Sequence, residues 1–310
     1  NYPMLLICVM LVGIGNNLWH PAAIPTLASR YPERKGLVLS IHGMGGNVGD
    51  ACAPLVIGAL LALLTWREIV MINVVPGFVM AVMILAFLGT LRITKAGASG
   101  DFGKDECKKQ DLGAYVQGLK RLVSDRGVTM LLIGSAFRNM TQSALLTFLP
   151  VYLAYEMGYS PWLVGVWMFA LQLAGFTAAP IAGHLSDKIG PRKIVMSSLG
   201  MTAVVLLAMA FAGKSHGFVL LIAILGFFLY AVRAVLQAWM LDSAPKNMGG
   251  TAIGVMFGVQ SLGSAIAPGL GGLIADEYGL IMAFYFMAVT IVIANVFVFL
   301  TPSPNRAAAH

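Results

Sequence analysis

Two arginines, Arg138 and Arg233, lie inside long apolar stretches of the sequence, where a charged side chain is rare. A charge at membrane depth costs at least ~2.5 kcal/mol on insertion scales, and a guanidinium group cannot shed its proton to avoid that cost. Its planar fork of donors matches the oxygens of a carboxylate or phosphonate. Gln142 lies one helical turn from Arg138, and Tyr230 lies three residues before Arg233. We therefore expect these four residues to bind the negative group of a small molecule.

Three further polar residues in apolar stretches extend this site. Asp50 and His20 can both exchange protons, and we expect them to couple proton movement to ligand movement. Asn16 lies one turn from His20 and is expected beside the ligand. A salt bridge to an arginine is an equal alternative for Asp50, and a packing role is an equal alternative for His20, which precedes a proline. Even when Asp50 neutralises one arginine, the other still needs an anion.

The composition places these residues in a membrane. The chain is 58% hydrophobic and only 11% charged, far from the roughly 25% charged residues of soluble domains. A span needs about 20 mostly apolar residues, and the sequence predicts an all-α integral membrane protein with nine such helices. Their ranges are 3–28, 37–64, 68–91, 128–150, 161–182, 192–212, 217–241, 250–275 and 280–301.

One long connection interrupts these spans. Residues 93–126 are rich in lysine, arginine, acids and glycine, which predicts a solvated linker with an amphipathic helix near 112–124 on the membrane surface. The predicted domains are therefore a three-helix piece, 1–92, the linker, 93–126, a six-helix bundle, 127–301, and a tail, 302–310.

Positive charges predict the orientation of the spans. Sixteen of the 20 lysines and arginines lie in or beside one set of alternate loops, and only Arg67 and Lys214 lie in the other set. By the positive-inside rule the first set is cytoplasmic: loops 29–36, 92–127, 183–193 and 242–249, with the C-terminus. The net charge of +7 therefore sets topology, and no nucleic-acid-binding motif accompanies it. We expect a multi-pass protein of the bacterial inner membrane.

An internal repeat connects two of the predicted helices. A shift of 214 residues places 27–58 on 241–272 with eight identical positions, where about two or three would match by chance. Both stretches carry small residues at every fourth position and then a proline: Gly49 with Pro54, and Gly263 with Pro268. Such faces let helices pack closely, and the prolines bend them. We expect hinges at these residues; ordinary helix packing is the alternative.

The turn between two predicted spans carries the strongest motif, Gly183-His-Leu-Ser-Asp187-Lys-Ile-Gly190-Pro-Arg192-Lys193. It resembles the cytoplasmic-loop signature of the major facilitator superfamily of transporters, with one extra proline before Arg192. Asp187 can cap a helix or pair with a cation, and the resemblance implies that the loop is a cytoplasmic gating latch. An ordinary positive-inside loop is the alternative.

A second resemblance concerns a branch of that superfamily. Asn17-Leu-Trp-His20-Pro21 and Ser40-Ile-His42-Gly43, followed further on by Arg138 and by the stretch from Thr147 to Tyr152, look like the fosmidomycin-resistance branch, whose members export drugs. The superfamily has twelve helices, so the resemblance implies that the chain holds the fourth to the twelfth; a natural nine-helix protein is the alternative. Many drug–proton exporters carry an arginine where this sequence has Val9, so that route of proton coupling is not available.

Together these features predict a secondary transporter, a proton-coupled exporter of a drug or small organic anion that works by alternating access in the lipid bilayer. An importer or exchanger of organic anions is the alternative. The sequence lacks H-E-x-x-H, G-x-S-x-G and paired catalytic carboxylates, which argues against a membrane enzyme. A receptor would not need cations at membrane depth. Three cysteines without paired spacing indicate neither a disulfide nor a metal site, and no cofactor is expected.

Overall fold

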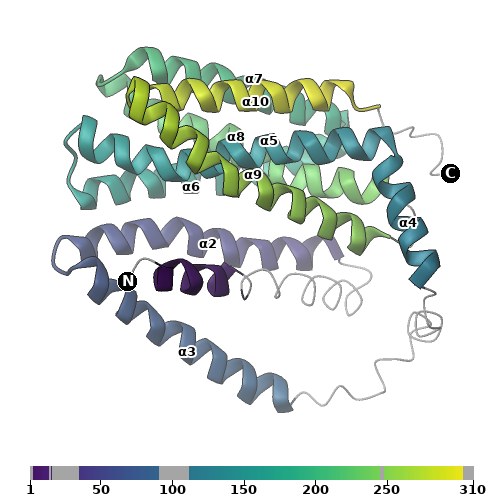
Figure 1. Ribbon diagram of the computed structural model, residues 1–310, viewed down its shortest axis with the longest axis horizontal. Helices are drawn as coiled ribbons and strands as arrows, with labels where there is room; N and C mark the ends of the chain where they lie inside the picture. Colours follow the sequence, from purple (N-terminus) through teal and green to yellow (C-terminus); the bar gives the residue numbers. More distant parts are fainter. Residues whose placement is uncertain (1–2, 14, 16–34, 91–111, 245–247, 303–310) are drawn as a thin grey trace. The chain divides into compact units, whose positions relative to one another are not determined.

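The computed structural model describes residues 3–13, 15, 35–90, 112–244 and 248–302 (Figure 1), and these are helical with no strand among them. The chain divides into two compact units, residues 1–47 and 48–310. The first unit contains the short apolar helix Pro3–Gly13 and the start of α2. His20 and Asn16 lie outside the described residues. The second unit contains the rest of α2 and all later helices.

Ten helical elements follow one another along the described chain, as labelled in Figure 1. They are α2 (Lys35–Leu61), α3 (Trp66–Thr90), α4 (Leu112–Ser124), α5 (Arg126–Val151), the π-helix η3 (Tyr152–Glu156), α6 (Pro161–Ile189), α7 (Pro191–Ala212), α8 (His216–Ser243), α9 (Gly249–Tyr278) and α10 (Met282–Leu300).

Six of the described helices are long and apolar enough to cross a membrane: α3, α6, α7, α8, α9 and α10. Helices α2 and α5, with 27 and 26 residues, also have the length of a span, which needs about 20 residues. The predicted all-helical membrane architecture is confirmed in this part of the chain. The count of nine spans and the predicted domain boundaries stay predictions.

The helix ends follow from short-range chemistry. Asp125 precedes α5 and accepts a hydrogen bond from the Val128 backbone N–H at 2.8 Å, which satisfies an otherwise unpaired donor. Gly190 separates α6 from α7 with φ +95°, a left-handed conformation that favours glycine. The sequence predicted that the helix beginning at 161 ends near 182. It continues past Pro180 and Gly183 to Ile189 and ends where Gly190 takes its positive φ.

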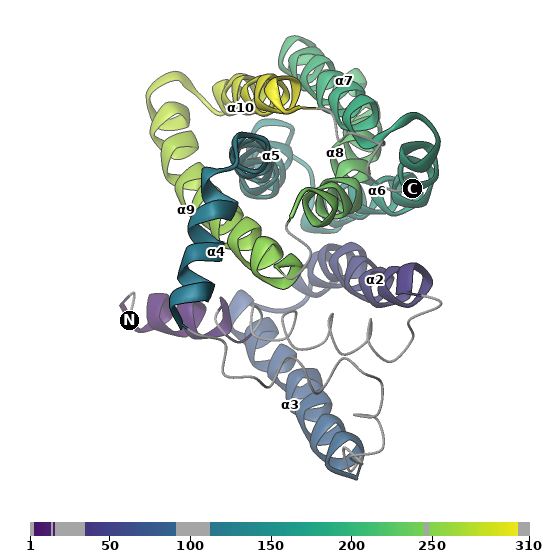
Figure 2. The ribbon, with the colours of Figure 1, turned by 90° about the vertical axis from the view of Figure 1, so that its right-hand side faces the viewer.

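Helices α5 to α10 form one bundle, which Figure 2 shows from another side. Helix α5 contacts α8, α9 and α10, while α8 packs along α6 and α7. Glycines permit the close approaches. A methyl group at Gly263 of α9 would come within 2.7 Å of the Ala136 carbonyl oxygen on α5, and one at Gly226 of α8 would meet the Leu171 carbonyl on α6.

Aromatic rings close one end of this bundle. Tyr152 lies 4.8 Å from Phe218 and 5.2 Å from Phe284, measured between ring centroids, and joins the ends of α5, α8 and α10. Nearby in the sequence, Lys214 forms an ion pair with Glu156 at 2.7 Å. Because α7 runs from Pro191 to Ala212, its first turn lies at the opposite end of the bundle.

The internal sequence repeat coincides with matching positions in helices α2 and α9. The shift of 214 residues carries Lys35, the first residue of α2, onto Gly249, the first residue of α9, and carries Pro54 onto Pro268. The predicted amphipathic helix is also present as α4. Its Leu122 is buried while Lys120 is exposed.

Candidate functional site

Arg138 lies in the middle of α5 and is only 2% exposed. Its Nη2 donates a hydrogen bond to the Leu229 carbonyl oxygen of α8 at 2.7 Å, while its Nε has no partner. Within the part of the chain that the structure describes, no acid forms an ion pair with this guanidinium. A hydrogen bond to this neutral carbonyl therefore holds a permanent charge inside the bundle.

Tyr230 and Gln142 lie beside this arginine. Tyr230 follows Leu229 on α8, and its ring packs against Gly175 of α6, where an added methyl group would come within 2.5 Å of the tyrosine Cβ. Gln142 lies one turn beyond Arg138 on α5, within interaction range of the Tyr230 hydroxyl. Both Gln142 Oε1 and the Tyr230 hydroxyl are buried, and neither has a hydrogen-bond partner among the residues that the structure describes.

Two further charges lie in reach of this cluster. Arg233 is exposed on α8 one turn after Tyr230 and interacts electrostatically with Arg138. Asp50 is exposed on α2 and lies within electrostatic range of the Tyr230 hydroxyl. The structure thus brings Arg138, Gln142, Tyr230, Arg233 and Asp50 together.

A polar seam between α5 and α9 was not singled out by the sequence patterns. Asn139 Nδ2 donates to Ser264 Oγ at 2.6 Å and to the Gln260 carbonyl oxygen at 3.2 Å. One turn further, Ser143 Oγ donates to the Ser264 carbonyl oxygen at 3.0 Å. The signal was present in the sequence, because Asn139 and Ser143 each directly follow one of the site residues Arg138 and Gln142. Helix α5 therefore presents Arg138 and Gln142 to α8, and Asn139 and Ser143 to α9.

The predicted hinge residues behave differently from one another. A side chain at Gly49 would meet open space, whereas one at Gly263 would meet the α5 backbone. The closest contact near Pro54 of α2 involves α6: a methyl group at Gly165 would lie 2.5 Å from the Pro54 carbonyl oxygen. Pro268 lies inside α9. Close packing is thus shown at Gly263 and Pro54, and the role of all four residues as hinges stays a prediction.

The predicted gating loop is mostly helix. Gly183 and Asp187 lie in the last turns of α6, and the Asp187 side chain lies outside the described residues. The residue before α7 is Gly190, which has no side chain with which to cap the helix. Arg192 donates from Nη2 to the Phe299 carbonyl oxygen at the end of α10, with its guanidinium carbon 5.5 Å from the Phe299 ring centroid. Lys193 is exposed.

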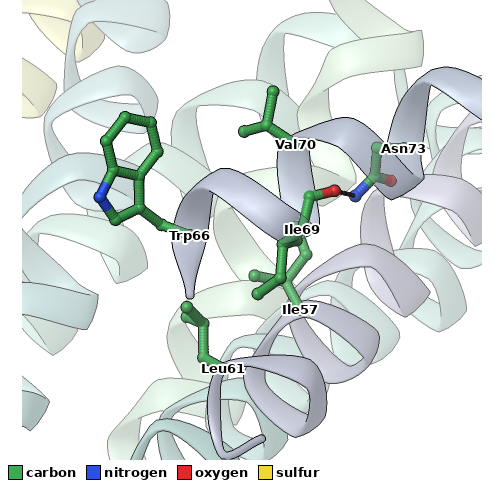
Figure 3. A pocket seen from close by; sticks show the side chains of 6 residues that line it. All are labelled: Ile57, Leu61, Trp66, Ile69, Val70 and Asn73. Carbon is green, nitrogen blue, oxygen red and sulfur yellow. Dashed lines mark hydrogen bonds between the residues drawn. The ribbon is translucent and has the colours of Figure 1, made fainter. Parts of the chain in front are cut away.

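A pocket of about 350 Å³ lies apart from this cluster, between the end of α2 and the start of α3 (Figure 3). Asn73, one of its lining residues, donates its amide to the Ile69 carbonyl oxygen at 2.9 Å. The rest of the lining is apolar apart from the indole N–H of Trp66. Its lining residues are Ile57, Leu61, Trp66, Ile69, Val70 and Asn73.

An apolar helical bundle that holds permanent charges at membrane depth is characteristic of integral membrane transport proteins. The sequence matches the family model of the Major Facilitator Superfamily over residues 1–178 and again over residues 131–310. The chain belongs to this superfamily. It is accordingly a transporter, and not an enzyme, as the sequence patterns predicted.

Known relatives agree with this assignment. The chain is 24% identical over 310 residues to the fosmidomycin resistance protein of Escherichia coli strain K12, covering 99% of this chain and 72% of that protein. It is 26% identical over 277 residues to the cis,cis-muconate transport protein of Acinetobacter baylyi, covering 88% and 66%. The crystal structure of the superfamily transporter FucP in its outward conformation has a TM-score of 0.68 at 18% identity, covering 98% of this chain and 77% of that one. The last likeness confirms the fold.

Proposed function

We propose that the protein is a secondary transporter of the bacterial plasma membrane that exports a drug or small organic anion in exchange for protons. The observation that carries this proposal is the burial of Arg138 with a single carbonyl partner and no acid among the described residues in ion-pair contact. A charge buried in this way is costly unless an opposite charge joins it. An anionic substrate supplies that charge.

The chemistry of the cluster supports an anion over a cation. Arg138 and Arg233 are permanent cations, and Asp50 is the one acid in electrostatic range of the Tyr230 hydroxyl between them. Two relatives point the same way: one is named for resistance to fosmidomycin, which is a phosphonate, and one for transport of muconate, an organic anion. Arg138, Gln142, Tyr230 and Arg233 bind the substrate in this proposal, with His20 and Asn16 as predicted further contacts.

Asp50 is the proposed proton carrier, with His20 as a second. A carboxylate near the arginines competes with an anionic substrate for the same positive charge. Protonation of Asp50 removes that competition, so proton binding and anion binding become linked. Positive linkage of this kind carries proton and anion in the same direction, as an importer would, whereas exchange requires the proton and the anion to occupy the site in alternation.

In the proposed alternating-access cycle the helices rock about the close contacts that α2 and α9 make. The cytoplasmic side in this proposal carries loops 29–36, 92–127, 183–193 and 242–249 and the C-terminus. In this scheme the contact of Arg192 with the end of α10 and the predicted latch at Asp187 both act at the cytoplasmic end. The runner-up function is an importer or exchanger of organic anions, which would use the same cluster in the opposite direction.

The proposal is tested by the affinity of the purified protein for fosmidomycin in wild type, Arg138→Lys and Arg138→Gln. Loss of the buried contact is expected to cost on the order of 2–5 kcal/mol in Arg138→Gln. The affinity of Arg138→Lys is expected to lie between those of wild type and Arg138→Gln, because lysine keeps the positive charge but lacks the planar pair of donors of arginine. Arg67→Gln, an exposed arginine over the Trp66 ring of α3, is the matched control. Equal affinity in all variants, or a preference for cationic drugs, would show that Arg138 is structural.

A further inference from the structure

Three buried polar atoms that lack a hydrogen-bond partner among the described residues belong to neighbouring side chains of this bundle: Arg138 Nε, Gln142 Oε1 and the Tyr230 hydroxyl. Buried polar atoms in proteins are nearly always paired, so a single exception calls for an explanation. Three unpaired atoms on neighbouring side chains of α5 and α8 call for one common explanation. A ligand that enters this cluster has to satisfy them together.

The three atoms differ in whether they donate or accept a hydrogen bond. Arg138 Nε carries an N–H and can only donate, and the Tyr230 hydroxyl can donate or accept. Both suit an anionic oxygen. Gln142 Oε1 can only accept a hydrogen bond. A ligand with only anionic oxygens therefore leaves this atom unpaired and places two acceptors next to each other, which is unfavourable in a buried site.

Tyr230 does not resolve this by pairing with Gln142. The hydroxyl interacts with the Gln142 side chain, but at this separation neither the hydroxyl nor Gln142 Oε1 has a hydrogen-bond partner among the described residues. The tyrosine packs directly on Gly175 of α6, which leaves no room for a side chain there: an added methyl group would lie 2.5 Å from Tyr230 Cβ and 2.8 Å from its Cγ. One turn earlier, Gly226 packs on the Leu171 carbonyl of α6. These two close contacts hold the ring, so its hydroxyl stays near Arg138.

We propose that the ligand of this cluster is an anion that also carries a neutral hydrogen-bond donor, a hydroxyl or N–H, two or three bonds from its charged group. Arg138 and Tyr230 bind the charged oxygen, and Gln142 Oε1 accepts the neutral donor. Gln142 is therefore the residue that selects among anions. The inference rests on the proposed function, because it takes an anion at Arg138 as given.

Sites built to accept a donor discriminate strongly against ligands that lack it, because the acceptor is then left buried and unpaired. A matched pair of acids makes this measurable. 3-Phenyllactate and 3-phenylpropionate differ only in one hydroxyl group beside the carboxylate. The measurement is the dissociation constant of each acid by isothermal titration calorimetry on the purified chain in lipid nanodiscs.

In wild type, 3-phenyllactate is expected to bind about tenfold or more tightly than 3-phenylpropionate, the size of one hydrogen bond to a buried acceptor. Gln142→Met removes the acceptor at similar length, and the two acids should then bind within about twofold of each other. Tyr230→Phe should weaken both acids and keep their ratio, since Tyr230 contacts the shared charged group. Gln117→Met, at an exposed glutamine of α4, is the control and should change nothing.

Equal affinity of the two acids in wild type, or a preference that survives in Gln142→Met, overturns the inference and leaves anion binding at Arg138 intact. Binding of neither acid, or binding of both that Arg138→Gln does not weaken, contradicts the proposed function and the inference with it. Thermal unfolding of each variant checks that it is folded. If Gln142→Met does not fold, the ratio of the two dissociation constants in wild type and in Tyr230→Phe still decides. Equal dissociation constants in wild type, or a preference for 3-phenyllactate that disappears in Tyr230→Phe, would refute the proposal that Gln142 accepts the neutral donor.

Discussion

Arg138 and Asp50 have opposite environments, although both were singled out as charges in apolar stretches. Arg138 is 2% exposed and held by the Leu229 carbonyl. Asp50 is exposed on α2, and its carboxylate acts on the Tyr230 hydroxyl through space. A buried permanent cation suits ligand binding, whereas the acid lies open at the surface of α2.

Replacement of Asp50 by asparagine is expected to separate substrate binding from proton coupling. The amide keeps the shape of the side chain but cannot titrate, so exchange of substrate across the membrane should persist. The acceleration of transport by a pH gradient should be lost. Counterflow and gradient-driven uptake are measured in the same proteoliposomes, and gradient-driven uptake at the wild-type rate in Asp50→Asn would exclude Asp50 as the proton carrier.

Sequence patterns located the charged residues of the site but not their partners. Arg138 and Gln142 share a helix face by their spacing, and their proximity to Tyr230 followed from the fold. The Leu229 carbonyl, the Gly175 surface behind Tyr230 and the Asn139–Ser264 hydrogen bond could not be predicted. These contacts depend on how two helices cross, and a periodic pattern within one helix does not contain that information.

Helices α2 and α6 meet backbone to backbone, which makes this contact sensitive to side-chain size. A methyl group at Gly58 would lie 2.6 Å from the Pro161 carbonyl oxygen and 3.1 Å from the Gly165 Cα. Backbone atoms cannot rotate away, so any larger residue at Gly58 must push the helices apart. In a transporter that alternates between two packings, such a wedge favours the state in which this contact is open.

Gly58→Leu is expected to shift that equilibrium by about 1–3 kcal/mol, the usual cost of overpacking, or roughly 5- to 150-fold in population. Spin labels at Leu63, 84% exposed, and at Trp162 of α6 should report longer distances than in the unsubstituted protein. Gly77→Leu is the control, because a side chain at Gly77 of α3 meets open space. Identical distance distributions in all three proteins would show that this contact plays no part in gating.

The helices themselves were predictable because long apolar stretches at membrane depth have few alternatives to a helix. Their ends were less so. Residues 183–189 looked like a loop because they are charged and begin with a glycine, yet they complete α6 as far as Gly190. Charge marks the point where a helix leaves the membrane, and backbone geometry decides where it ends.

The orientation of the whole chain is predicted from its charges and can be tested on the bundle. Lys193 at the start of α7 and Ser215 just after its end lie at opposite ends of that helix. In a background without Cys8, Cys52 and Cys107, cysteines introduced at these two positions should react from opposite sides of the membrane. Labelling of the Lys193 position from inside and of the Ser215 position from outside is expected; the reverse would refute the positive-inside assignment.

Transport by the purified protein tests the proposed function most directly. The full chain is reconstituted in proteoliposomes, and entry of fosmidomycin is followed with the lumen more acidic than the outside, so that protons leave as the anion enters. Uptake above the equilibrium level is expected, abolished by a proton ionophore and reduced to near background in Arg138→Gln. Uptake that ignores the pH gradient, or that Arg138→Gln supports at the wild-type rate, would contradict proton-driven transport of an anion held by Arg138.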